Sequence, residues 1–310
     1  MLHLFATADL WQATLQAAVL LLLPALGGVI SERSGVVNIA MEGMMLVAAF
    51  FSVAADLAWH NPWLATLVGM AAGALMALIH AVVSIRFRAD QIVSGIAINI
   101  MAAGLTVFLV NRIYGLQDVG HVGQSELLPN LNVPVLDQIP FLGQVFFKQN
   151  IVVYVALLLL VLIQLILFRT RLGLRIRAVG EHPQAADTAG INVYLIRYGA
   201  VITSGLLSGL AGAFLAIGVS NTFVPNMTDG RGYIALAAMI FGKWTPLGAF
   251  VACLIFGLGE AIYANNSTIA ISPYLLSMLP YLLTLIVLAG LVGRSSPPAA
   301  DGIPYVPGSE

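Results

Sequence analysis

The chain has 310 residues, of which 60% are hydrophobic and 9% are charged, and its formal net charge is −1. A soluble protein carries charge on roughly a quarter of its residues, because charged groups cover its surface. The composition therefore excludes an ordinary soluble domain, and the balanced charge offers no broad basic surface for nucleic acid. It predicts an all-α, polytopic membrane protein.

Apolar segments of about 20 residues, the length that crosses the hydrocarbon core, follow one another along the chain. In order they are 11–30, 36–57, 62–85, 91–113, 150–168, 197–219, 246–264 and 273–293. A further apolar stretch, 228–243, is shorter and flanked by Arg231 and Lys243. Whether this stretch crosses the membrane decides the topology.

Arginine and lysine favour the cytoplasmic side of a membrane protein. The linker 169–197 carries five arginines, which places it in the cytoplasm. If 228–243 crosses, ten basic residues lie inside and three lie outside, namely Arg112, Lys148 and Arg231. The count predicts nine transmembrane helices, with the N-terminus outside and the C-terminus inside.

Two segments share a spacing that suggests an internal repeat. In Arg33–Met41 and again in Arg231–Met239, an arginine near a glycine stands eight residues before a methionine, just after a long span. This favours an inverted repeat of 11–113 and 197–293, although chance also produces such matches. Transporters with such repeats bind substrate near the repeat interface.

The remaining segments complete a single transmembrane domain, residues 1–294. Residues 150–168 and the cytoplasmic segment 169–197 join the two repeat halves. The tail 295–310 is rich in proline and small residues, so we expect a disordered cytoplasmic tail.

Polar groups inside membrane spans are costly and indicate a function. Glu42 lies one turn inside the second span, and Asn38 lies four residues before it, on the same face of a helix. Asn99 lies near the middle of the fourth span. Glu32 and Arg33 belong either to a surface turn or to a helix break that lines a cavity. For Asn38, Glu42 and Asn99, hydrogen bonding between helices without substrate contact is the alternative.

No catalytic or metal-binding pattern stands out in the sequence. The five histidines lack metal-ligand spacing, and no HExxH motif is present. Gly242-Lys243-Trp244 lacks the upstream glycine and the hydroxyl residue of a P-loop. Glu260, near the end of the eighth span, is expected to reach the membrane surface. We predict no enzyme, no metal site and no cofactor.

The cytoplasmic linker predicts one short helix. Pro183, with His182 before it, suits a first helical position, and Gly190 suits a stop after 184–189. A short helix on a basic cytoplasmic loop is well placed to dock against a soluble motor. A surface turn between two spans fits these residues equally well.

Three stretches resemble one family of transport proteins. Residues 177–191, RAVGEHPQAADTAGI, resemble the coupling segment of ABC-importer permeases of the ribose, simple-sugar and branched-chain amino-acid group. Residues 31–45 and 232–248 agree with the same group. Residues 31–45 look most like the nucleoside-uptake permeases within it, which pair with a second, longer permease.

The resemblance implies a permease subunit of an ATP-driven importer in the bacterial cytoplasmic (inner) membrane, working by alternating access. Its implied partners are a second permease subunit, a cytoplasmic ABC ATPase that binds the ATP, and an extracytoplasmic substrate-binding protein. The chain would contact membrane lipid and a small solute, but no nucleic acid. A nucleoside is the expected solute. The alternatives are an ABC permease for a ribose-like simple sugar, or a secondary transporter that is driven by an ion gradient.

The resemblance implies one group of functional residues, and the polar positions in and beside the apolar spans predict a second group. Those that couple to the ATPase are Gly180, Glu181, His182, Pro183, Ala186, Asp187 and Gly190. Those that line the substrate pathway are Glu32, Asn38, Glu42 and Asn99.

Overall fold

The computed structural model describes residues 7–115, 122–132, 139–264 and 296–308. Within these ranges seven helices are long and apolar enough to cross a membrane. They are α2 (Ala8–Glu32), α3 (Met41–Trp59), α4 (Pro62–Ala81, continued by the π-helix η1, Val82–Arg86), α5 (Gln91–Tyr114), α7 (Ile151–Arg169), α10 (Val193–Ala213, continued by the π-helix η4, Phe214–Ser220) and α12 (Pro246–Ala264). The expected span 273–293 lies outside the described residues.

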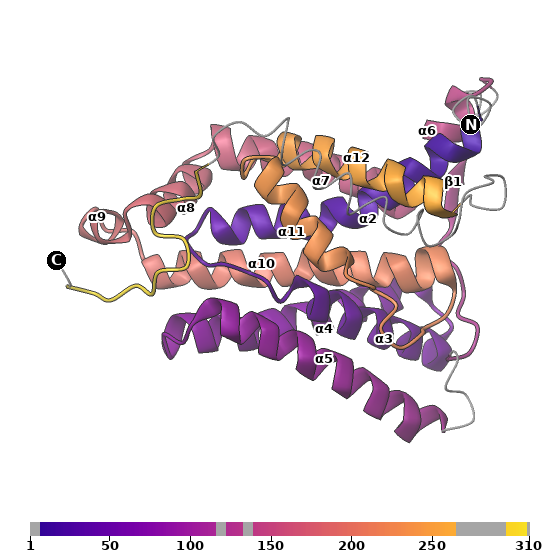
Figure 1. Cartoon of the computed structure of the whole chain (residues 1–310), viewed down its shortest axis with the longest axis horizontal. Coiled ribbons are helices and arrows are strands. Elements are labelled where there is room, and N and C mark those ends of the chain that lie inside the picture. Colours follow the sequence, from indigo (N-terminus) through magenta and orange to yellow (C-terminus); the bar gives the residue numbers. More distant parts are fainter. Residues whose placement is uncertain (1–6, 116–121, 133–138, 265–295, 309–310) are drawn as a thin grey trace.

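Shorter elements gather at the two ends of the molecule (Figure 1). Helices α8 (Arg171–Glu181) and α9 (Pro183–Thr188) lie at one end, beside the C-terminal residues 296–308. At the other end lie α6 (Leu142–Phe147) and the strands β1 (Asn130–Asn132) and β2 (Lys148–Asn150). The strands pair antiparallel, with Asn130 opposite Asn150. We call these the α9 end and the α6 end.

Several helices begin at a side chain that caps their first turn. Asn61 accepts hydrogen bonds from the backbone N–H of Trp63 and Leu64 at the start of α4, and Asp90 does the same for α5. A cap satisfies N–H groups that have no partner inside the helix, and so fixes where the helix starts. The observed starts of α4 and α5 therefore match the predicted spans 62–85 and 91–113.

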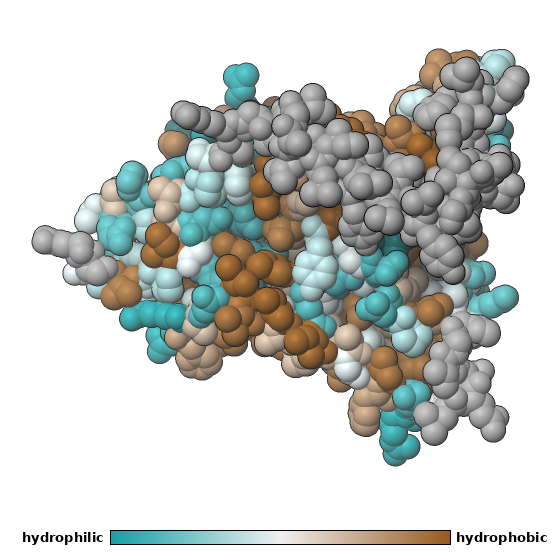
Figure 2. All heavy atoms as spheres, viewed as in Figure 1, coloured by the Kyte–Doolittle hydropathy of each residue, from teal (hydrophilic) through white to brown (hydrophobic). Residues whose placement is uncertain are grey.

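Helices α2, α3 and α10 form the interior, and α5 and α7 lie at the periphery. About four fifths of the apolar stretch is buried in α2 and in α10, against one third in α5 and in α7. The outward faces of α5 and α7 are themselves apolar, as lipid or a partner subunit requires. In the space-filling view, a patch of hydrophobic residues lies in the lower middle of the face, with hydrophilic residues on both sides of it (Figure 2).

Glycines allow α4 and α10 to pack closely. A Cβ added to Gly205 would lie 2.3 Å from the Ala77 Cβ and 2.6 Å from the Gly73 carbonyl oxygen. A Cβ added to Gly73 would lie 2.5 Å from the Gly205 carbonyl oxygen. Gly69 and Gly73 on α4, like Gly205 and Gly209 on α10, have the GxxxG spacing that brings membrane helices into backbone contact.

The stretch 228–243 is not one crossing helix. Its helical part, α11 (Arg231–Phe241), has 11 residues, which at 1.5 Å per residue span about 16 Å of a hydrocarbon core about 30 Å thick. Helix α11 starts in the middle of the molecule and runs toward the α9 end (Figure 1). A helix over the whole stretch does not form because Asp229 and Gly230, just before α11, have φ values of +45° and +81°, outside the right-handed helical region.

The C-terminal tail departs from the expected disorder. Ala300 donates its backbone N–H to the Gly180 carbonyl at 2.9 Å, and Arg197 donates to the Ile303 carbonyl at 3.0 Å. Tyr305 is 4% exposed. The prediction of a disordered tail is wrong for residues 296–308, because an aromatic side chain and several backbone groups find partners on α8 and α10.

Candidate functional site

Two non-helical segments enter the interior from opposite ends of the molecule. The first, residues 33–40, separates α2 from α3, and the second, residues 221–230, separates η4 from α11. Backbone of this kind is tolerated inside a membrane protein only where its polar groups find partners or line a cavity. We call 33–40 the first break and 221–230 the second break.

Side chains from neighbouring helices satisfy the backbone of the first break. Gln91 accepts from the Val37 N–H at 2.7 Å, and the His80 Nε2 lies 2.9 Å from the Val37 carbonyl. Because a carbonyl only accepts, His80 carries its proton on Nε2, which leaves Nδ1 to accept from Ser94 at 3.0 Å. Side chains of α4 and α5 therefore stabilise the non-helical backbone of the first break.

Asn38 lies within the first break and not on α3. Its amide nitrogen donates to the Ser204 Oγ on α10 at 2.8 Å, and its oxygen accepts from the Ala40 N–H at 3.1 Å. It is fully buried. The expectation that Asn38 and Glu42 share one helical face is wrong, because α3 begins only at Met41.

Glu42 is the point where the two breaks meet. Its carboxylate accepts from the Gly230 N–H at 2.9 Å and from the Gly232 N–H at 2.6 Å, at the start of α11. A negative charge at a helix N-terminus is favourable because the N–H groups there are unpaired and the helix dipole is positive. A Cβ on Gly232 would lie 2.5 Å from the Glu42 Cα, so only glycine permits this approach.

Asn99 connects the interior to an exposed tyrosine. Its oxygen accepts from the Gly43 N–H at 2.8 Å. Its amide donates to the Ile39 carbonyl at 3.0 Å and to the Tyr233 hydroxyl at 2.8 Å. Asn99 is 8% exposed and Tyr233 is 44% exposed. We call Asn38, Glu42 and Asn99, with their hydrogen-bond partners, the polar centre. Tyr233, which the sequence did not single out, extends the polar centre to the surface of this subunit.

Glu32 and Arg33 tie the end of α2 to the turn between α11 and α12. The Trp244 indole N–H donates to the Glu32 carboxylate at 2.5 Å, and the Arg33 Nε donates to the Trp244 carbonyl at 2.9 Å. Glu32 is 3% exposed. Glu32 is therefore buried against another element at the point where the first break begins.

The four expected pathway residues are thus buried or nearly so, and each has partners inside the protein. The structure brings Asn38, Glu42 and Asn99 together around the two breaks, while Glu32 lies nearer the α9 end. Sequence reasoning missed His80, Gln91, Ser204 and Tyr233. The signal was available, because His80 and Ser204 are also polar residues within apolar spans.

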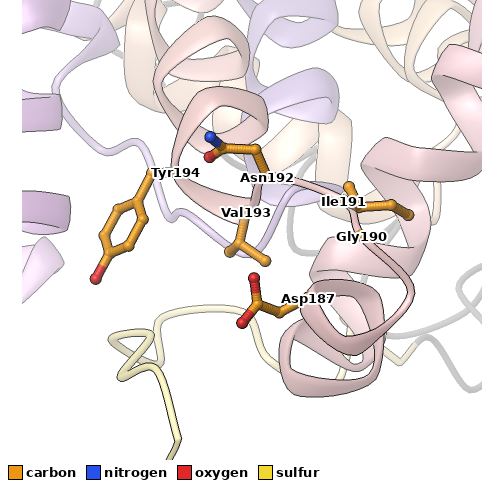
Figure 3. Close-up of a pocket in the computed structure, with 6 residues that line it drawn as sticks. All are labelled: Asp187, Gly190, Ile191, Asn192, Val193 and Tyr194. Atoms are coloured by element: carbon orange, nitrogen blue, oxygen red, sulfur yellow. The ribbon is translucent and has the colours of Figure 1, made fainter.

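The predicted short helix forms in the linker. Helix α9 begins at Pro183 with His182 before it, and Gly190 follows with a φ of +80°, which favours glycine. A hollow of about 320 Å³ lies beside it, lined by residues 190–194 and Asp187 (Figure 3). Glu181, His182 and Asp187 are exposed, whereas Gly180, Pro183 and Ala186 are buried. The segment therefore presents polar side chains outward from a packed base.

Near the α6 end, Glu260 does not reach outward alone. Arg231 donates its Nε to the Glu260 carboxylate at 2.7 Å and a second guanidinium nitrogen to the Met227 carbonyl at 3.1 Å. The pair fixes the first turn of α11 on α12. The sequence did not predict this ion pair between Arg231 and Glu260.

Metal chemistry finds no support in the described part of the chain. No three histidine, cysteine, aspartate or glutamate side chains gather there as metal ligands. Cys253 is a buried free thiol. The polar centre consists instead of amides, hydroxyls and backbone groups, with its one carboxylate, Glu42, already bonded to α11.

Comparison with known proteins gives consistent matches over almost the whole chain. The guanosine ABC transporter permease protein NupQ of Bacillus subtilis is 47% identical and covers 96% of both chains. The nucleoside ABC transporter permease protein NupC of Lactococcus lactis is 43% identical and covers 92% of this chain and 93% of its own.

A solved ABC transporter of the metal-chelate type, in an inward-facing conformation, shares the fold. Its TM-score is 0.52 at 17% identity, over 90% of this chain and 85% of the other. The model of the family described as "Branched-chain amino acid transport system / permease component" matches residues 11–288. The chain is a multi-pass membrane transport subunit, not itself an enzyme, and it belongs to this permease family, as its resemblance in 31–45, 177–191 and 232–248 indicates.

Proposed function

We propose that this chain is a permease subunit of an ATP-driven importer that carries nucleosides across the bacterial inner membrane. The observation that carries the proposal is the 43–47% identity, over more than nine tenths of the chain, to permeases named for guanosine and for nucleosides. In this mechanism the subunit performs no covalent chemistry. It alternates between states open to either side while a partner ATPase hydrolyses ATP.

The polar centre supports a neutral, polyhydroxylated solute. Asn99 and Tyr233 offer an amide and a hydroxyl, which donate and accept hydrogen bonds without a fixed charge. A solute hydroxyl or base amide can exchange with such groups at little electrostatic cost. We place the solute-facing surface at Asn99 and Tyr233, and assign Asn38, Glu42 and Glu32 to holding the breaks that shape this surface.

The topology we propose has nine crossings, with the N-terminus outside and the C-terminus in the cytoplasm. The second break and α11 together count as one crossing, as does 273–293. In support, α8 and α9 share one end of the molecule (Figure 1), and the linker that contains them carries five arginines. The halves 11–113 and 197–293 would then be inverted repeats, whose breaks enter from opposite ends and meet at Glu42.

The partners we propose are a second permease subunit, an ABC ATPase and an extracytoplasmic binding protein. The second permease would cover Tyr233, so that the solute passes between two subunits. The ATPase would receive α9 in a groove, in contact with the exposed side chains of Glu181, His182 and Asp187. ATP then binds to the partner, and this chain holds no cofactor.

Uptake of labelled guanosine by cells that lack only this chain tests the substrate. We expect uptake to fall to background and to return with the wild-type gene, and excess adenosine or guanosine, but not excess ribose, to compete. A Tyr233→Phe variant, which keeps the ring and removes the hydroxyl, should raise KM with little change in subunit assembly. Normal guanosine uptake in the deletion strain would refute the nucleoside assignment.

A further inference from the structure

The C-terminal residues 296–308 cross the α9 end of the molecule and contact three parts that are distant in sequence. In Figure 1 this segment, in yellow, runs beside α8 and α9 and past the start of α10. We call it the strap. Its neighbours are the coupling segment around Gly180, the first turns of α10 and the start of the first break.

The strap is fastened to the coupling segment by backbone and side chain. Ala300 donates its N–H to the Gly180 carbonyl at 2.9 Å, and Ala299 donates to the Glu181 carboxylate at 3.2 Å. Tyr305 packs with Val179 at the end of α8 and with Ala186 on α9. Its hydroxyl lies near the carboxylate of Asp187, which lines the hollow drawn in Figure 3.

The strap is also fastened to α10. Arg197, which is 1% exposed, donates from Nη1 to the Ile303 carbonyl at 3.0 Å. The Tyr305 ring lies edge-to-face against Tyr194, with 5.5 Å between ring centroids. A fully buried arginine is costly unless its hydrogen bonds are made, so the strap supplies part of what keeps Arg197 in the interior.

The third contact of the strap is with the first break. A Cβ on Gly35 would lie 3.0 Å from the Ala300 carbonyl oxygen, and one on Gly180 would lie 2.2 Å from the Arg33 carbonyl oxygen. Asp301 faces both Glu32 and Arg197. Burial raises the pKa of the Asp301 carboxyl to about 7, and the positive charge of Arg197 acts against this rise.

From these contacts we propose that the strap is a working part of the coupling apparatus. It holds α9 and the end of α8 against the first break, so that a displacement of α9 by the ATPase moves the break, and through Glu42 the start of α11. Without the strap, α9 would retain its covalent connections to α8 and α10, the packing of Ala186 against Val179 and Val193, and, through α8, the contact of Gly180 with Arg33. The inference rests on the proposed ATP-driven import, but not on which solute is carried.

The rival explanation is that the strap only covers an apolar surface. A cover contributes to stability and assembly, whereas a mechanical link sets how much solute is moved for each ATP hydrolysed. The two are separated by measuring guanosine imported per ATP hydrolysed. The assay uses proteoliposomes that contain the complete transporter with its binding protein, and normalises both rates to assembled complex.

Three variants make the test, with one matched control. Tyr305→Ala removes the anchor on α9, Tyr305→Phe keeps the ring and loses the hydroxyl, and a stop codon at Ser296 removes the strap. Ile303→Ala is the control, because its side chain is 56% exposed and its carbonyl still accepts from Arg197. We expect guanosine per ATP to fall about fivefold or more in Tyr305→Ala, the scale of a typical coupling energy.

The truncated chain should lose at least as much, Tyr305→Phe should keep most of the coupling, and the control should match wild type. A wild-type ratio in both Tyr305→Ala and the truncated chain would overturn the inference. A loss of assembled complex with an unchanged ratio of guanosine to ATP would also overturn it, because a strap that only covers an apolar surface would affect stability and not coupling. Absence of ATP-dependent guanosine import in wild type would instead contradict the proposed function, and is distinguishable because it needs no variant.

Discussion

At the scale of single residues, the polar side chains of the interior are used to complete broken backbone. Gln91, His80 and Asn99 each bond a backbone group of the first break. Glu42 bonds one backbone group at the end of the second break and one in the first turn of α11. An unpaired buried N–H or C=O costs about 1–3 kcal/mol, so each of these side chains stabilises a conformation that apolar residues could not hold.

Glu42 offers the sharpest test at this scale. Glu42→Ala leaves the N–H groups of Gly230 and Gly232 without their acceptor, which should lower the stability of the subunit by about 2–5 kcal/mol. Glu42→Gln keeps one acceptor oxygen and should lose less. Thermal unfolding of the purified complex in detergent measures the order wild type, Gln, Ala.

The matched control for Glu42 is Glu126→Ala, whose side chain is exposed. Its Tm should equal that of wild type. If Glu42→Ala unfolds at the wild-type temperature as well, Glu42 does not hold the start of α11, and the meeting of the two breaks would need another explanation.

At the scale of elements, the contact between α4 and α10 depends on the absence of side chains. Gly205→Ala places a methyl group where the Ala77 Cβ and the Gly73 carbonyl already lie, so the helices must separate. We expect a loss of about 1–3 kcal/mol, as for other overpacked interiors, and a lower yield of assembled complex.

Gly199→Ala is the control on the same helix, since nothing lies within 4 Å of its added Cβ. Alanine there should be neutral or slightly stabilising, because it has the higher helix propensity. Size-exclusion chromatography and Tm of the two variants decide the question. If Gly205→Ala and Gly199→Ala had the same Tm and the same yield of assembled complex, the contact between α4 and α10 would not depend on glycine at position 205.

At the scale of the whole molecule, hydropathy and helix-end residues predict most of the long helices. The expected spans agree with α2, α4, α5, α7, α10 and α12, because each is a long apolar run bounded by caps or charges. The α9 helix was predictable from Pro183 and Gly190 for the same reason. These features depend on residues that are close together in the sequence, so hydropathy and helix-capping patterns are enough to predict them.

The remaining features depend on contacts that are distant in sequence. Residues 36–40 were predicted as the start of the second span, yet they are non-helical because His80, Gln91, Asn99 and Ser204 supply hydrogen bonds to them. Residues 296–308 read as disordered, yet Arg197 and Gly180 hold them. No periodicity shows such partners in advance, although polar residues within apolar spans indicate where to look.

The central claim, ATP-driven movement of a nucleoside through this subunit, is tested most directly in proteoliposomes containing the complete transporter. Labelled guanosine is offered with its binding protein, and either ATP or an imposed proton or sodium gradient is the only energy source. The account predicts guanosine accumulation with ATP, none with either gradient, and no inhibition by excess ribose. Accumulation driven by a gradient without ATP, or a preference for ribose over guanosine, would contradict it.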